Sequence, residues 1–265
     1  MTNEVPAATR DLPVLSARSI SKRFGNVVAL ESVDFEVYSG EIVALVGDNG
    51  AGKSTLTKVI SGAIAPDSGT IELNGRHVSF RTPADARDAG IETTYQDLAL
   101  AGDLDIAANL FLAREILRPG ILGRLDFLDR AAMRKRSEEH LRDFGIRIDS
   151  MSQRVDTLSG GQRQSIAVAR SVFWGSALVI MDEPTAALGV TQSALVFQLM
   201  RKVRDAGTAV VFISHNLPQV FEAADRVVIM RRGRRVGTLD PHVATMDQAV
   251  GLMTGAMASH ESAPS

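Results

Sequence analysis

Short apolar runs alternate with amphipathic stretches over much of the chain. Residues 41–46, 177–181 and 208–213 are rich in valine, isoleucine and alanine, as expected of strands buried on both faces of a sheet. Residues 191–206 carry apolar side chains three and four positions apart, and Gly207 follows as a C-cap signal, so this stretch predicts a surface helix. This order predicts an α/β fold with a mostly parallel sheet, whose ligands bind beyond the carboxyl ends of the strands.

The pattern changes toward the two ends of the chain. Residues 14–20 and 27–37 contain alternating positions typical of strands. Residues 226–239 have the pattern of two strands joined by a turn at Arg232 and Gly233. We expect these stretches to form an antiparallel β layer.

The middle of the chain favours helices. Residues 105–174 lack strong strand signals, and residues 130–144 are dense in charge, as expected of a solvated helix. We therefore predict a helical lobe over about residues 98–174. The expected domain plan is a disordered arm, a single domain and a disordered tail, at residues 1–13, 14–256 and 257–265.

Composition narrows the classes of partner. Lysine and arginine total 29 against 31 acidic residues, so the charge balance gives no electrostatic reason to expect nucleic acid. The chain has no cysteine, which excludes a disulfide framework and a thiolate metal site and fits the cytoplasm. Its apolar runs are far shorter than the roughly 20 residues of a membrane-spanning helix, so we expect a role at a membrane to require a partner.

A glycine-rich segment between an expected strand and an expected helix fits the phosphate-binding pattern G-x-x-x-x-G-K-[ST]. The glycines allow backbone amides to turn toward an anion, Lys53 reaches the β and γ oxygens, and Ser54 can offer an oxygen to Mg²⁺. An incidental lysine in a glycine-rich turn is the alternative, and the flanking elements argue against it. The residues expected to bind ATP here are Gly47, Asp48, Asn49, Gly50, Ala51, Gly52, Lys53, Ser54 and Thr55.

Two acidic residues end the apolar strand expected at residues 177–181. Asp182 suits a metal ion, directly or through water, and Glu183 is placed to polarise the water that attacks a γ-phosphate. Taken alone, both acids could simply begin a solvated turn, because Pro184 follows. Together with the phosphate-binding loop, they favour ATP hydrolysis.

The segment Leu158-Ser159-Gly160-Gly161-Gln162-Arg163-Gln164 resembles the signature motif of ABC transporter ATPases. Ser159 and the amides after it open a helix predicted to end near Ser171, which makes a second anion site. A serine N-cap with flexible glycines is the alternative, but it does not explain the whole segment. The resemblance implies a homodimer in which this helix start binds ATP held by the opposite subunit, through Ser159, Gly160, Gly161 and Gln162.

Further family landmarks follow in order. Gln96 looks like the glutamine that approaches Mg²⁺ and the attacking water, although an isolated glutamine is more often a surface residue. His215 resembles the switch histidine that contacts the γ-phosphate; its alternative is a cap on the next helix. Phe24 stands where the family stacks an aromatic ring on adenine, and a core phenylalanine is the alternative. The resemblance implies a P-loop NTPase core carrying an antiparallel β layer and a helical lobe.

One position departs from the general family pattern. Gly189 stands where an aspartate is usual, which puts in doubt the usual communication between two ATP sites. The same glycine matches the ATPases of bacterial ribose, xylose and fructose importers. Further segments similar to that group are residues 48–52, 94–98, 107–115, 184–190 and 253–256.

The resemblance to single-half members of that group implies ATP-driven import of a monosaccharide from the cytoplasmic face of the cell inner membrane. The implied partners are an integral-membrane permease, docked in a groove near residues 98–113, and indirectly a substrate-binding protein. The alternatives are a soluble ABC ATPase acting on nucleic-acid complexes, an exporter ATPase, and a non-hydrolysing regulatory subunit. Gly189 favours the regulatory alternative and Glu183 opposes it.

Overall fold

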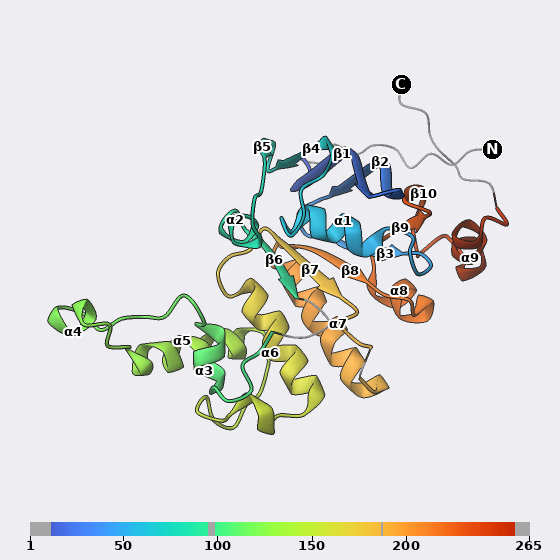
Figure 1. Ribbon diagram of the computed structural model, residues 1–265. Helices are drawn as coiled ribbons and strands as arrows, with labels where there is room; N and C mark the ends of the chain where they lie inside the picture. The colour runs from blue at the N-terminus through green and yellow to red at the C-terminus, as the bar shows by residue number, and fades with distance from the viewer. Residues whose placement is uncertain (1–11, 95–98, 187, 258–265) are drawn as a thin grey trace.

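The computed structural model describes residues 12–94, 99–186 and 188–257. In this part of the chain the strands form a six-stranded and a four-stranded sheet, with helices on both faces of the larger one (Figure 1). The predicted arm and tail lie almost entirely outside the described residues, so both remain predictions.

The larger sheet has the strand order β10-β9-β3-β8-β7-β6, with β9 and β10 antiparallel and its other pairs parallel. Its strands are β3 (Ile42–Val46), β6 (Ile91–Thr94), β7 (Leu178–Asp182), β8 (Ala209–Ile213), β9 (Arg226–Arg231) and β10 (Arg234–Leu239). The three apolar runs are thus confirmed as central strands, to within one residue at each end.

The prediction for residues 226–239 was half right. A hairpin forms there, but β9 pairs in parallel with β3, so the hairpin extends the larger sheet instead of joining the antiparallel layer. The reason is the continuous apolar run of β9, in which Val227 to Met230 are all buried. Such a run suits a strand covered on both faces.

The smaller sheet is antiparallel, with the order β2-β1-β4-β5. Its strands are β1 (Leu15–Phe24), β2 (Val27–Val37), β4 (Ser68–Leu73) and β5 (Arg76–Val78). The first two confirm the antiparallel layer. The other two were not predicted, although Asn74 and Gly75 between them both have positive φ, as in a tight hairpin turn.

Alternating residues of the central strands enter two separate cores. Val43 and Leu45 of β3 pack with helix α1 (Lys53–Ile60) and the smaller sheet, whereas Ile42, Ala44 and Val46 pack with helices on the opposite face. This two-residue period fixes the register of the strand. As a result, the carboxyl end of β3 is held rigidly where the phosphate-binding loop begins.

The helical segments between the strands are α1 (Lys53–Ile60), α2 (Pro83–Asp88), α3 (Ile106–Leu110), α4 (Ile121–Arg124), α5 (Arg130–Asp143), a 3₁₀ turn (Val155–Thr157), α6 (Gly160–Val172), α7 (Val190–Asp205), α8 (Leu217–Ala223) and α9 (Met246–Thr254). Helices α3 to α6 stand to one side of the sheets in Figure 1. Of these, α3, α5 and α6 share a core of their own around Phe111, whose ring meets those of Phe173 and Trp174 edge-on. In the described part of the chain, no helix is long and apolar enough to span a bilayer.

Candidate nucleotide-binding site

The phosphate-binding loop connects β3 to α1, as the sequence predicted. Gly47 and Gly52 have φ of 150° and 103°. A Cβ on Gly47 would lie 2.2 Å from the Met230 carbonyl oxygen, and one on Gly52 would lie 2.8 Å from the Ala29 carbonyl oxygen. The neighbouring backbone therefore leaves room only for glycine at these two positions.

Lys53 begins α1 and reaches back over the loop. Its ammonium donates to the carbonyl oxygens of Gly47 at 2.7 Å and Asp48 at 3.0 Å. Partial burial lowers the pKa of Lys53, and the charges of Glu183, Asp48 and Asp182 oppose that shift. The N-cap, Gly52, has no side chain to cap the helix, so the positive end of α1 adds to the attraction of Lys53 for phosphate.

Asp182 ends β7 beside this lysine. Burial raises the pKa of the Asp182 carboxyl, and the charge of Glu183 raises it further, while Lys53 and Lys58 lower it. Ser54 is exposed at the start of α1. A hydroxyl and a carboxylate are oxygen ligands of the kind that Mg²⁺ prefers, so these residues fit that ion.

The described residues contain no group of three or more histidine, cysteine, aspartate or glutamate side chains that could hold a metal. Mg²⁺ is usually held by one or two protein oxygens together with phosphates and water. The third predicted ligand, Gln96, lies outside the described residues.

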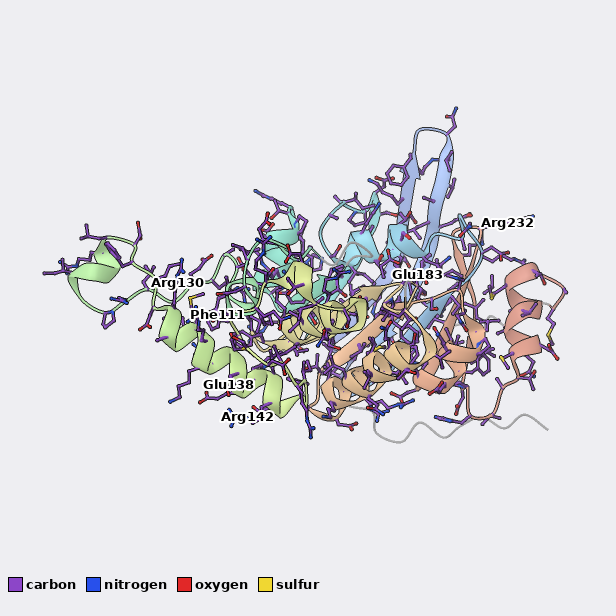
Figure 2. The ribbon with its side chains drawn as sticks, turned by 90° about the horizontal axis from the view of Figure 1, so that it is seen from below. Phe111, Arg130, Glu138, Arg142, Glu183 and Arg232 are labelled. Carbon is purple, nitrogen blue, oxygen red and sulfur yellow. The ribbon has the colours of Figure 1, made fainter. Side chains whose placement is uncertain are left out.

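Glu183 and His215 meet across the carboxyl ends of two adjacent strands, β7 and β8. His215 Nδ1 lies 2.8 Å from Glu183 Oε1, with 75% of the histidine side chain exposed and 19% of the glutamate side chain. Figure 2 shows Glu183 between the β9–β10 hairpin, marked by Arg232, and the helical lobe, marked by Phe111. The pair can therefore present a carboxylate and an imidazole to a ligand above the phosphate-binding loop.

The alternative interpretation of His215 as a helix cap is wrong. Asn216 caps α8 instead, because its side-chain oxygen accepts the Gln219 N–H at 3.3 Å. The imidazole remains available to the site, where it bonds to Glu183.

The predicted second anion site is the start of α6. Ser159 is its N-cap: the hydroxyl accepts the Gln162 N–H at 3.2 Å, and the Gln162 side chain accepts the Ser159 N–H at 3.0 Å. Ser159 therefore caps the helix, as the alternative interpretation expected. Its hydroxyl accepts one hydrogen bond there and can still donate its own proton to a ligand. Gly161 packs closely on α7, since a Cβ there would lie 3.0 Å from Gln192 Cγ.

Within one chain, Ser159 and the phosphate-binding loop line different cavities. Ser159, Gly161 and Gln162 line a groove of about 380 Å³ with residues of α7. The loop residues Asp48 to Ala51 line another of about 230 Å³ with the β9–β10 turn and α9.

Phe24 lies at the end of β1 with half of its surface exposed and the Lys22 ammonium 5.8 Å from its ring centroid. The core alternative for Phe24 is therefore wrong. Thr55 is partly buried in the first turn of α1. Gly189 is the N-cap of α7 and donates its N–H to Gln192 Oε1 at 3.3 Å.

A third cavity, of about 370 Å³, lies between the helical lobe and the larger sheet. Of the stretch predicted as a docking groove, Ala99, Leu110, Leu112 and Ala113 line it. Arg114, the residue after that stretch, also lines it. Sequence reasoning missed the lining residues from other elements, because no local pattern connects them: Arg87, Ile91, Glu92, Arg170 and Trp174.

A phosphate-binding loop between a parallel strand and a helix, with acidic residues ending the next-but-one strand of the sheet, defines a P-loop ATPase. The family model described as "ABC transporter" matches residues 30–186, and the chain belongs to this family.

Two curated relatives match nearly the full length of the chain. The fructose import ATP-binding protein FrcA of Rhizobium meliloti is 54% identical over 92% of this chain and 95% of its own. The xylose/arabinose import ATP-binding protein XylG of Sulfolobus acidocaldarius is 44% identical over 91% and 94% of the respective chains.

Solved structures show the same fold. A nucleotide-free ATP-binding cassette of an ABC transporter has a TM-score of 0.77 at 22% identity, covering 91% of this chain and 98% of that one. A dimeric cassette in a post-hydrolysis state, bound to ADP and phosphate, has a TM-score of 0.70 at 22% identity, with coverage of 86% and 98%.

Proposed function

We propose that this chain is the ATP-hydrolysing subunit of an importer that carries a monosaccharide through a membrane permease. The observation that carries the proposal is the full-length similarity to fructose and xylose/arabinose import ATP-binding proteins. The nucleotide site supports it, because the chain has a phosphate-binding loop and a carboxylate suited to activating water. The comparisons give no support to a nucleic-acid-remodelling or purely regulatory subunit.

In the proposed site, the loop amides and Lys53 bind the β- and γ-phosphates of ATP, and Phe24 stacks on adenine. Ser54 and Asp182, together with the predicted ligand Gln96, would hold Mg²⁺, which would supply positive charge against the phosphates. Glu183 accepts a proton from the attacking water, and His215 orients the carboxylate and contacts the γ-phosphate. Lys53 must exchange its bonds to the loop carbonyls for bonds to phosphate oxygens.

The proposed active form is a homodimer. Ser159 and the phosphate-binding loop line separate cavities of one chain, so a single chain offers the α6 start no phosphate of its own. In a head-to-tail dimer, Ser159, Gly160, Gly161 and Gln162 of one subunit bind ATP held by the other. Closure around two nucleotides is then the step that moves the permease.

The permease is proposed to dock in the groove of about 370 Å³ between the helical lobe and the larger sheet, at the cytoplasmic face of the inner membrane. Its apolar lining includes the exposed Leu112 and the partly buried Trp174, which suits a helix end. A substrate-binding protein acts indirectly, through the permease.

The test is reconstitution of the chain with a candidate permease in vesicles that contain the matching binding protein. Phosphate release should rise when the binding protein carries its sugar, and labelled sugar should accumulate only with ATP. Leu112→Ala, at an exposed position of the groove lining, should preserve basal hydrolysis but weaken that stimulation. Basal hydrolysis without sugar-dependent stimulation, across the permeases encoded beside the gene, would contradict the importer proposal.

A further inference from the structure

The turn between β9 and β10 packs directly on the phosphate-binding loop. Arg232 and Gly233 form this turn with φ of 47° and 78°, the left-handed pair expected of a two-residue hairpin turn. The Gly233 N–H donates to the Ala51 carbonyl at 3.0 Å, and the Gly233 carbonyl accepts the Glu31 N–H at 2.8 Å. One residue of the hairpin therefore ties the loop to β2.

No side chain fits at this junction. A Cβ on Gly233 would lie 2.9 Å from the Ala29 carbonyl oxygen. A Cβ on Gly52 would lie 2.8 Å from the same oxygen and 3.3 Å from Gly233 Cα. The loop, β2 and the hairpin thus meet mainly through backbone atoms, with the Leu30 side chain also close to Gly52. Arg234 adds an ion pair to Glu31, with Nε 3.0 Å from Oε2.

The bond from Gly233 fixes the direction of the next amide of the loop. In a trans peptide unit the C=O and N–H point in opposite directions, and no cis peptide occurs among the described residues. Because the Ala51 carbonyl is directed at the hairpin, the Gly52 N–H points away from the hairpin. This amide stands at the entrance of α1, where backbone amides meet phosphate in sites of this kind.

We propose that Gly233 is a positioning residue for ATP: its N–H anchors the Ala51–Gly52 peptide so that the Gly52 N–H is aimed at the nucleotide phosphates. The inference rests on the proposed function, since it concerns the same ATP site. Gly233 touches neither phosphate nor the attacking water and acts through Ala51. A preorganised amide lowers the ordering cost of binding, so the anchor acts on nucleotide affinity.

The test compares Gly233→Ala with Gly175→Ala. Both glycines have left-handed φ, 78° and 75°, so alanine strains both alike, but a Cβ on Gly175 would meet no atom within 4 Å. Dissociation constants for ATP and ADP are measured in the Glu183→Gln background, together with Tm. We expect Gly233→Ala to raise both dissociation constants about tenfold or more. This is the effect of losing one hydrogen bond to a charged group, here the bond from the Gly52 N–H to phosphate. Gly175→Ala should leave them unchanged while lowering Tm.

Two outcomes would overturn this inference alone: unchanged affinity in Gly233→Ala, or an equal loss in both variants, since either makes Gly233 merely structural. If Gly233→Ala does not fold, the test rests on the wild-type chain. A wild-type readout needs no variant: amide exchange at Gly233 should slow when ADP binds. Unchanged exchange contradicts the anchor, whereas a wild-type chain that binds no ATP overturns the proposed function as well.

Discussion

At the residue scale, the Glu183 carboxylate takes its orientation from His215. Glu183 has a φ of 51°, which costs a non-glycine residue about 1–3 kcal/mol, and its N–H is fixed by a bond to the Ile213 carbonyl at 3.0 Å. The surrounding strands therefore impose this position. The position puts the carboxylate 2.8 Å from His215 Nδ1, where the imidazole can hold it in place.

Removing the imidazole should slow hydrolysis without abolishing ATP binding. We expect His215→Ala to lower kcat roughly 10- to 100-fold, because the carboxylate loses its orienting partner. Steady-state phosphate release measures this, with His242→Ala, an exposed histidine beyond β10, as the control. An unchanged kcat would show that Glu183 does not depend on His215.

Glu92, in the groove beside the helical lobe, should make stability depend on pH. Burial raises the pKa of its carboxyl, although Arg114, Arg87 and Arg170 act in the opposite direction. The folded state therefore holds the proton more tightly, and stability is lost as pH rises from the ordinary carboxyl pKa through the raised value.

Replacing Glu92 by glutamine removes this titration. Glu92→Gln should have a higher Tm than wild type near pH 8, and the difference should disappear below about pH 4, where the carboxyl is protonated in both states. Thermal unfolding at several pH values measures it. A lower Tm for the variant near pH 8 would mean that the arginines outweigh burial.

At the element scale, two helices begin with the same capping box. Ser159 and Gln162 cap α6, and Thr245 and Gln248 cap α9. Their geometry is nearly identical, yet only α6 carries the family's signature motif. Comparing the α6 and α9 caps therefore separates the contribution of a cap to stability from a role in ATP binding.

Ser159→Ala and Thr245→Ala should each destabilise the fold by about 1 kcal/mol. Only Ser159→Ala should also reduce ATP hydrolysis, because only that hydroxyl is proposed to meet a phosphate. Tm and phosphate release are measured on both variants. If the two variants had equal hydrolysis rates and equal Tm values, Ser159 would serve only as a helix cap.

Helix α7 can accept the aspartate that most of the family has at its start. Gly189 has an ordinary φ of −72°, and a Cβ there would meet no atom within 4 Å. Gly189→Asp should therefore raise the stability by a few tenths of a kcal/mol, since aspartate caps better than glycine. A clear drop in the Tm of Gly189→Asp would contradict this prediction, because it would mean that the aspartate side chain is crowded at this position.

The sequence allowed prediction wherever the signal lies within a single element. The apolar runs of β3, β7 and β8, the periodic face of α7 and the serine at the start of α6 are signals of this kind. The placement of β9 in the larger sheet and the contact of Gly233 with Ala51 depend on segments far apart in the chain. The 2.8 Å approach of His215 to Glu183 likewise follows from strand order, which no local pattern contains.

At the scale of the whole molecule, one chain holds the two halves of the proposed ATP site in different places. The phosphate-binding loop packs against the core between the two sheets and against the β9–β10 turn. The start of α6 belongs to the helical lobe. Two copies arranged head to tail would bring each half to the other. Hydrolysis should consequently depend on protein concentration as well as on ATP.

The most direct test of the account is phosphate release with Mg-ATP by wild type and Glu183→Gln, run alongside ATP-dependent sedimentation. We predict that Glu183→Gln lowers kcat about 100-fold or more, because the attacking water loses its base, while ATP binding persists and ATP holds the variant as a dimer. Wild-type hydrolysis that does not depend on Glu183, or a variant that stays monomeric at saturating ATP, would contradict it.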